Sequence, residues 1–209
     1  MTTPSSIYGK CKDTLPLVER VMLERLTHLN KETKAKTGEG IYEHLGSRIK
    51  AEDSMREKCA RKGLSETPES ALTKIHDAVG FRVITTFIDD IYTNVDYLKS
   101  FDDITVIEEK DYIRHAKPNG YRSYHMILAL TLPYEDILGN NPGKFYVEIQ
   151  LRTIAMDTWA SLEHQMKYKH DIGSANQKLI TVELKRCADE LASCDVSMQT
   201  IRDLIRDSR

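Results

Sequence analysis

The sequence predicts an α+β fold: a mixed central β-sheet of four or five strands flanked by helices, with helical extensions at both termini. Two observations favour this class. The first and last quarters of the 209-residue chain carry apolar residues at helical spacing, and short runs rich in β-branched and aromatic residues fill the centre. This order of elements is typical of one sheet covered by helices. We expect an N-terminal helical segment over 1–40, a central domain over 41–170 and a C-terminal helical segment over 171–209.

The N-terminal quarter predicts two helices separated by a polar break. Residues 15–29 carry apolar side chains three and four positions apart, as one face of a helix requires. These apolar residues are Leu15, Val18, Met22, Leu26 and Leu29. The lysine-rich stretch 30–40 contains two glycines and predicts a break. A second helix is expected from Glu52 to Lys62, where Gly63 ends it.

The centre predicts four strands, each bounded by Gly, Pro, Asn or Asp. The four runs are GFRVITTF (80–87), ITVIEE (104–109), SYHMILALTL (123–132) and FYVEIQL (145–151). Between the first two runs, the apolar spacing predicts a helix over 89–101. Two further helices are expected after the last strand, over 154–169 and from Gln177 to the C-terminus.

The composition indicates a cytoplasmic globular protein. The formal net charge is −2, so no overall charge points to a nucleic-acid or membrane partner. No apolar run approaches the roughly 20 residues that span a bilayer, and the polar N-terminus does not resemble a secretory signal. The four cysteines lack zinc-type spacing and the density of a disulfide scaffold, which favours reduced thiols.

Two carboxylates are the candidate catalytic groups. Glu148 lies on the most clearly alternating strand, on the same face as Gln150 and Arg152. Asp77 lies where a helix is expected to end near Gly80 and a strand to begin. Together the two carboxylates could hold one Mg²⁺, which typically takes one or two protein carboxylates plus phosphate oxygens. The alternatives are a solvated outer face of a strand for the first and a polar helix-end residue for the second.

Cations cluster in the segment GSRIKAEDSMREKCARKG. If the segment forms one helix, three cations and one hydroxyl fall within roughly 80° of each other and suit a polyphosphate. They are Lys50, Ser54, Lys58 and Arg61. A solvated charged face is the alternative. Arg48 before this stripe and Arg82 after Asp77 could stack on the two faces of one nucleobase.

A second cationic segment, EEKDYIRHAKPNGYRSYH, interleaves cations with aromatic residues around a turn at 118–120. The interleaved residues are Lys110, Arg114, His115, Lys117, Tyr121, Arg122, Tyr124 and His125. Such a turn could stack a base while cations neutralise its phosphates. A hairpin with solvated charges would leave this interleaving unexplained.

Four motifs resemble the synthetase domain of the RelA/SpoT family, most closely its small single-domain alarmone synthetases, over residues 42–169. These are HDAVGFRV, KDYIRHAKPNGYRSYH, VEIQLRT and AMDTWASLEHQMKYK. The resemblance implies a nucleotidyltransferase-like synthetase fold for the central domain. It also implies transfer of the pyrophosphate of ATP to the ribose 3′-hydroxyl of GDP or GTP, which makes (p)ppGpp and AMP.

Carried over to this sequence, the resemblance implies that Asp77 and Glu148 bind Mg²⁺ and that Glu148 also orients or deprotonates the 3′-hydroxyl. Arg48 and Arg82 would hold the adenine, and Tyr121 would stack on the guanine. The ATP phosphates would be held by Lys50, Ser54, Lys58 and Arg61. The acceptor side would also include Lys110, Lys117, His125, Gln150 and Asp157. Two positions depart from the family pattern: Ser47 replaces a frequent glycine, and Lys110 replaces a frequent arginine.

Other readings stay open from sequence. A toxin branch of the same family pyrophosphorylates the 3′ end of tRNA, or makes adenosine alarmones, and is controlled by an antitoxin. A tRNA footprint, or a solvated loop, could be formed by the cations Lys31, Lys34, Lys36, Arg61 and Lys62. A non-catalytic nucleotide sensor is the third reading. The terminal helices could also form a homo-oligomer, which the resemblance suggests is a tetramer, or the C-terminal helix could pack back on its own domain.

Overall fold

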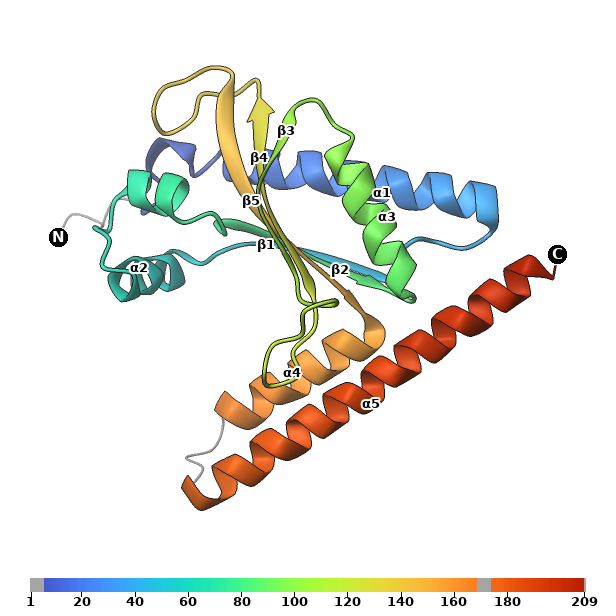
Figure 1. Cartoon of the computed structure of the whole chain (residues 1–209). Helices are drawn as coiled ribbons and strands as arrows, with labels where there is room; N and C mark the ends of the chain where they lie inside the picture. The colour runs from blue at the N-terminus through green and yellow to red at the C-terminus, as the bar shows by residue number, and fades with distance from the viewer. Residues whose placement is uncertain (1–5, 169–173, 209) are drawn as a thin grey trace.

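The computed structural model describes residues 6–168 and 174–208 and shows five strands and their flanking helices (Figure 1). This mixed sheet confirms the predicted α+β class. In chain order the elements are η1 (Gly9–Cys11), α1 (Leu15–Thr37), β1 (His44–Ile49), α2 (Glu52–Arg61), η2 (Ser70–Lys74), β2 (Val79–Thr85), α3 (Ile88–Lys99), β3 (Ile104–Asp111), β4 (Tyr124–Leu132), β5 (Gly143–Thr153), α4 (Ile154–Tyr168) and α5 (Ser174–Asp207).

The strands lie in the order β1-β2-β5-β4-β3. β2 and β5 are parallel, and the other neighbours are antiparallel. In β5 the residues Phe145, Val147, Ile149 and Leu151 are buried, while Glu148 and Gln150 on the other face are half-buried. The alternation predicted for this strand is therefore confirmed.

One face of the sheet packs against helices and forms the hydrophobic core with them. α1 contacts β1 and β2, and α3 contacts β2, β3 and β5. Apolar side chains of both helices share one buried cluster with the inward residues of the strands, for example Met22, Leu98 and Ile149. Packing on this side leaves the opposite face of β1, β2 and β5 open, with Arg48 and Arg82 exposed on it.

α1 is longer than predicted. The break expected over 30–40 is wrong for its first part, because the helix continues to Thr37 and ends at Gly38, whose φ is +83°. The apolar stripe stops at Leu29, yet lysine, glutamate and alanine are good helix formers and carry the helix two turns further. Glycine then supplies the left-handed conformation that commonly ends a helix.

Two predictions around the site are wrong. Lys50 does not share a helix with Ser54, because β1 ends at Ile49 and α2 begins at Glu52. The helical segment before Asp77 ends at Lys74, and Gly80 lies inside β2 rather than at a helix end. The predicted helix over 52–62, ended by Gly63 with a φ of +67°, is confirmed to within one residue.

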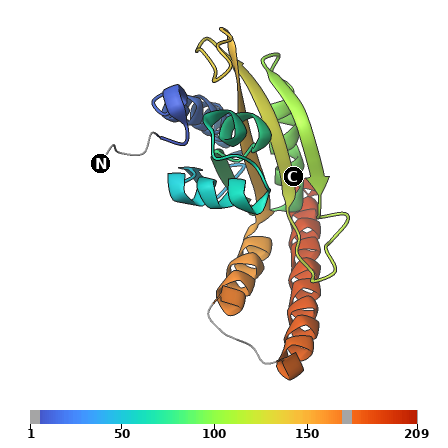
Figure 2. The ribbon, with the colours of Figure 1, turned by 90° about the vertical axis from the view of Figure 1, so that its left-hand side faces the viewer.

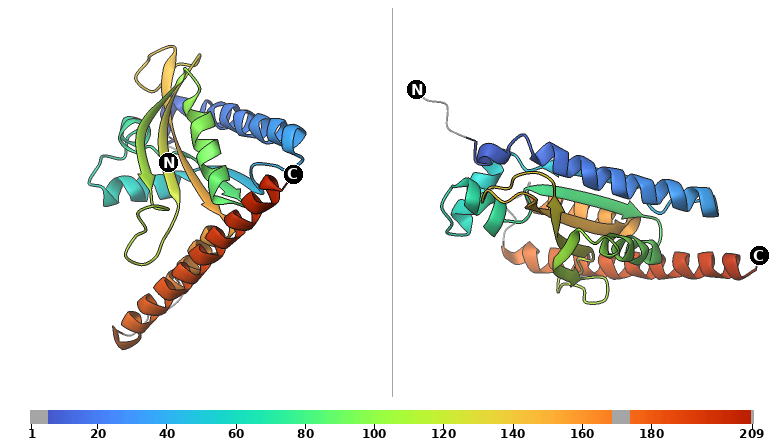
Figure 3. Two further views of the ribbon diagram at one scale, coloured as in Figure 1. Left: turned by 45° about the vertical axis from the view of Figure 1, so that its right-hand side comes forward. Right: turned by 90° about the horizontal axis from the view of Figure 1, so that it is seen from above.

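α4 and α5 lie side by side at one end of the sheet, and α5 runs past it as one long helix (Figures 2 and 3). Trp159 of α4 is buried and donates a hydrogen bond from Nε1 to the Leu184 carbonyl of α5 at 2.8 Å. The predicted helix end at Lys169 and the domain boundary at 170/171 lie outside the described residues. None of the described helices has the length and apolar character that a membrane span needs.

Candidate active site

Strand register places six of the predicted site residues in two neighbouring rows across the open face of the sheet. The first row contains Gly46, Arg82, Gln150, His125 and Lys110, one residue from each strand. In the second row Arg48 pairs with Gly80, and Gly80 pairs with Glu148. Paired residues in a sheet point to the same face, so residues far apart in sequence meet here.

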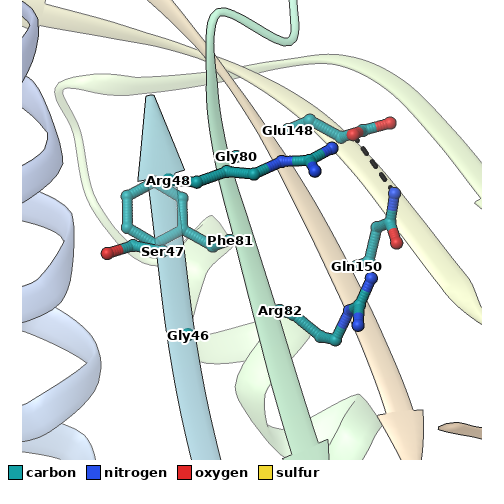
Figure 4. Close-up of a pocket in the computed structure, with 8 residues that line it drawn as sticks. All are labelled: Gly46, Ser47, Arg48, Gly80, Phe81, Arg82, Glu148 and Gln150. Atoms are coloured by element: carbon teal, nitrogen blue, oxygen red, sulfur yellow. Dashed lines mark hydrogen bonds between the residues drawn. The ribbon is translucent and has the colours of Figure 1, made fainter. Parts of the chain in front are cut away.

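A pocket of about 250 Å³ lies on β1, β2 and β5 (Figure 4). Its lining residues are Gly46, Ser47, Arg48, Gly80, Phe81, Arg82, Glu148 and Gln150. In Figure 4 the Arg48 side chain points toward Glu148, and the Arg82 side chain points toward Gln150. Gln150 Nε2 donates a hydrogen bond to Glu148 Oε2 at 3.2 Å.

Gly80 leaves the middle of the second row without a side chain. A Cβ at this position would lie 3.9 Å from both Cγ and Nε of Arg48. A side chain here would therefore make an ordinary van der Waals contact with Arg48, and glycine leaves the position between Arg48 and Glu148 open. The sequence indicated Gly80 only as an expected helix end. Phe81 and Ser47 also line the pocket and were not predicted as site residues.

Asp77 is held by two lysines. Its Oδ2 lies 2.8 Å from Lys50 Nζ and 2.5 Å from Lys58 Nζ, and its side chain is only 11% exposed. Burial opposes ionisation, but the hydrogen bonds from the two lysines outweigh it and lower the pKa of the Asp77 carboxyl. The two predicted phosphate-binding lysines thus converge on the carboxylate although they come from different elements.

Asp77 and Glu148 belong to the same end of the β2–β5 pair. Asp77 precedes Val79, which pairs with Val147. The ring of His76 stacks on Tyr146, with centroids 4.2 Å apart, so the neighbours of both carboxylates are in contact. The other two residues predicted for phosphate binding, Ser54 and Arg61, are exposed on α2.

The loop between β3 and β4 brings aromatic rings and cations together as the interleaved sequence suggests. Lys117 Nζ lies 4.6 Å from the centroid of the Tyr112 ring and 4.9 Å from that of Tyr121. Tyr121 is also edge-on to Trp159, with centroids 6.3 Å apart. Lys110, by contrast, pairs with Glu108 at 2.6 Å.

His125 lies next to this loop, and its Nε2 and the Tyr121 Oη share a hydrogen bond at 2.7 Å. Burial, together with the nearby cations Arg152 and Lys117, lowers the pKa of His125 from 6.5 to about 4. The imidazole is therefore neutral near pH 7.

Arg152 joins several site residues and was not predicted to have a role. Its guanidinium donates to Tyr121 Oη at 2.7 Å, to Asp157 Oδ1 at 2.9 Å and to Gln150 Oε1 at 3.2 Å. Asp157 Oδ1 also lies 3.7 Å from Arg82 Nη1. The sequence signal was the alternation that places Arg152 on the same strand face as Gln150 and Glu148.

Two curated relatives of the chain are GTP pyrophosphokinases. The GTP pyrophosphokinase YwaC of Bacillus subtilis is 41% identical over 165 residues, which cover 79% of this chain and 76% of that protein. The GTP pyrophosphokinase YjbM of the same organism is 32% identical over 167 residues, which cover 80% of this chain and 75% of that protein.

Solved structures of similar proteins share the fold. A GTP pyrophosphokinase family protein from Streptococcus pneumoniae superposes with a TM-score of 0.77 at 31% identity, covering 94% of this chain and 93% of that one. Small alarmone synthetase 1 from Bacillus subtilis, bound to its product pppGpp, gives 0.74 at 28% identity, covering 90% and 92%. The sequence signature described as "Region found in RelA / SpoT proteins" matches residues 47–173. With more than half of its 209 residues inside that signature, the chain belongs to the RelA/SpoT family.

Proposed function

We propose that this protein transfers the pyrophosphate of ATP to the ribose 3′-hydroxyl of GDP or GTP, making (p)ppGpp and AMP. One observation carries the proposal: a single sheet face brings Glu148 between a pair of arginines and an aromatic–cationic loop. The arginine pair and the loop would each provide a base-stacking site, one on either side of the carboxylate. The curated relatives named above are GTP pyrophosphokinases, which favours a guanosine acceptor over the 3′ end of tRNA.

The ATP side of the site would use the exposed guanidinium groups of Arg48 and Arg82 to hold the adenine between them. Lys50 and Lys58 lie together at Asp77 and would meet the phosphates, with Ser54 and Arg61 further along α2. Because the lysines are already gathered by a carboxylate, they reach the phosphates with little reorganisation.

The residues present fit Mg²⁺. Asp77 Oδ1 is buried and has no hydrogen-bond partner among the described residues, so it is an acceptor available to a cation. The Glu148 oxygen that does not bind Gln150 points away from it (Figure 4). Two protein carboxylates together with phosphate oxygens are a typical ligand set for this ion. When bound, Mg²⁺ would neutralise charge on the transferred pyrophosphate.

The acceptor side would use the ring of Tyr121 to stack on guanine, with Lys117 and Lys110 near the phosphates. Neutral His125 would support Tyr121 through their hydrogen bond and meet a phosphate through its other ring nitrogen. Gln150 and Asp157 lie beside this site through their contacts with Arg152. Stacking contributes about 1–3 kcal/mol per base, enough to orient the ribose.

The reaction forms a bond between the 3′-oxygen of the acceptor and the β-phosphorus of ATP and breaks the bond between that phosphorus and the oxygen bridging to the α-phosphate. AMP leaves. Glu148 accepts the hydroxyl proton or orients the hydroxyl for attack, and the lysines offset the charge on the leaving phosphate. Positioning and electrostatic stabilisation supply most of the acceleration in this class of transfer.

The test is AMP release from labelled ATP with Mg²⁺ and GDP or GTP, with tRNA in a parallel reaction. We expect product with the guanine nucleotides and none at the tRNA 3′ end. Glu148→Gln should lower turnover by at least about a thousandfold while ATP binding, measured by calorimetry, stays near that of the wild type. Modification of tRNA alone would support the toxin reading, with its antitoxin partner. ATP and GDP binding without AMP release would support a nucleotide sensor.

A homo-oligomer built on the terminal helices accompanies this proposal. The C-terminal half of α5 exposes apolar side chains, including Val196, Met198, Ile201, Leu204 and Ile205. Exposed apolar stripes of this kind favour association. Light scattering of the purified chain would give its mass, with a tetramer as the expected state and a monomer as the contrary result. We further propose a cytoplasmic location, where both nucleotide substrates are available.

A further inference from the structure

Arg152 is a buried cation at the end of β5. Its side chain is 7% exposed, so it is not placed to meet the phosphates of an incoming nucleotide. Its guanidinium instead makes three hydrogen bonds inside the protein, to Tyr121, Asp157 and Gln150. The guanidinium carbon also lies 5.3 Å from the centroid of the Tyr121 ring. One rigid group therefore contacts both the proposed stacking ring of Tyr121 and Gln150, the residue that hydrogen-bonds Glu148.

The orientation of the Gln150 amide follows from this contact. An amide carries an acceptor oxygen and a donor nitrogen at similar positions, and its neighbours decide which way it turns. A guanidinium only donates, so the Gln150 oxygen faces Arg152. The nitrogen must then face Glu148, where it donates to Oε2 at 3.2 Å. Arg152 thereby determines which hydrogen bond the Glu148 carboxylate receives.

We propose that Arg152 is a positioning residue for pyrophosphate transfer, which holds the ring of Tyr121 directly and orients Glu148 through Gln150. This inference rests on the proposed function. The same guanidinium contacts Tyr121 and Gln150. It would therefore fix the position of the guanine of the acceptor relative to the carboxylate that meets its 3′-hydroxyl. Lysine keeps the charge but lacks the planar guanidinium that contacts Tyr121 and Gln150 at the same time.

The first experiment measures kcat and both KM values for Arg152→Lys. Loss of a charge-assisted hydrogen bond corresponds to about a tenfold change or more. We expect kcat to fall at least about tenfold and the acceptor KM to rise severalfold, while the ATP KM stays within about twofold. A change that only loosened the fold would raise both KM values together.

Arg25→Lys is the matched control. Arg25 also forms a fork with a carboxylate, Asp103, at 3.0 and 2.6 Å, and its guanidinium lies 4.4 Å from the ring centroid of Phe101. It belongs to α1, on the core side of the sheet. Losing this fork should cost similar stability in urea unfolding and leave kcat and both KM values near those of the wild type.

A double-mutant cycle separates positioning from general support. If Arg152 acts on Glu148 through Gln150, then Gln150→Ala and Arg152→Lys remove the same contribution to kcat. The double variant should then have nearly the kcat of the slower single variant. Additive losses in kcat, equal rises in both KM values, or an Arg152→Lys enzyme that behaves like Arg25→Lys would each overturn the inference. If the wild type makes no product from GDP or GTP, the proposed function itself fails. If the wild type makes product but the variants do not show the expected kinetics, the proposed function stands and only the role of Arg152 fails.

Discussion

Tyr121 is held from three sides in the proposed acceptor site. His125 and Arg152 each share a hydrogen bond with its hydroxyl at 2.7 Å, and Trp159 meets its ring edge-on. A ring fixed in this way loses little further freedom when a base stacks on it, so more of the stacking energy contributes to binding.

Substitution of Tyr121 should therefore act on one substrate. Tyr121→Ala is expected to raise the acceptor KM about tenfold to a hundredfold, in line with the loss of one base–aromatic stack, with little change in the ATP KM. Tyr121→Phe keeps the ring and should raise the acceptor KM much less. Initial-rate kinetics with each nucleotide varied in turn would measure both values. A similar increase for ATP would contradict the stacking role.

The lowered pKa of His125 should make the stability of the fold depend on pH. Its folded-state pKa of about 4 lies below the ordinary 6.5, so between these values the unfolded chain binds the proton more readily. The contribution to stability is complete above pH 6.5 and is lost as the pH falls toward 4. Between pH 7 and 5 the loss should be about 2 kcal/mol.

Urea unfolding of wild type and His125→Asn at both pH values would measure this contribution. Burial raises the pKa values of Asp90 and Asp195, which makes them stabilise the fold as the pH falls. Both groups are present in both proteins, so the difference between the two slopes isolates the histidine. Identical slopes would show that His125 is not buried as a neutral group.

Residue chemistry explains what the sequence revealed of the site. Carboxylates, cations and tyrosines in a suggestive order identified Glu148, Asp77 and Tyr121 as candidates. The partners of each group depend on strand register, which one sequence does not reveal. Arg152 was therefore visible only as one residue of an alternating strand, although its contacts reach both sides of the site.

At the scale of elements, the loop between β3 and β4 depends on α5. Gly120 has a φ of +92° and lies so close to the helix that an added Cβ would be 2.5 Å from Ala188 Cβ. Arg122 donates to the carbonyls of Gly120 and Ala188 and pairs with Asp189. The helix thus forms the support on which the proposed acceptor loop lies.

Gly120→Ala should displace the loop from α5 and raise the acceptor KM while the ATP KM stays nearly constant. Ala188→Gly in the same chain removes the clashing atom and should restore part of the acceptor affinity, although the positive φ still disfavours alanine by about 1 kcal/mol. Titration calorimetry with GDP would compare the single and double variants. No recovery in the double variant would contradict the packing argument.

Element prediction succeeded where the apolar pattern was strong. α3, β4 and β5 each bury one regular face, and their ends agree with the sequence to within two residues. β1 was missed because HLGSRI lies on an open sheet edge with little burial, so it carries no clear alternation of apolar residues. Lys50 consequently reaches Asp77 from a strand end, not from the helical stripe that its spacing suggested.

For the whole molecule, α5 contacts both the core domain and the proposed acceptor site. Near its C-terminal end Arg202 is 6% exposed, donates to Asp90 of α3 at 2.7 Å and lies 4.1 Å from the ring centroid of Phe87. Further back Asp195 accepts a hydrogen bond from Thr153 of β5 at 2.6 Å. These contacts fix one long helix to the sheet and to α3.

Arg202→Ala should destabilise the fold by about 3 kcal/mol, because it leaves Asp90 buried without its cation. The matched control is Arg186→Ala on the same helix. Arg186 is exposed and pairs with Glu183 and Glu190, so its loss should destabilise the fold much less. Urea unfolding would measure both. Equal losses for the two variants would show that α5 is held elsewhere.

Trp159 is the single tryptophan of the chain, and it is buried at the junction of α4, α5 and Tyr121. Its fluorescence is consequently an intrinsic probe of this junction, because the chain contains no other tryptophan. A guanine stacked on Tyr121 would change the fluorescence of Trp159. An adenine held between Arg48 and Arg82 would leave that fluorescence almost unchanged. The protein thus carries its own label for distinguishing its two nucleotides.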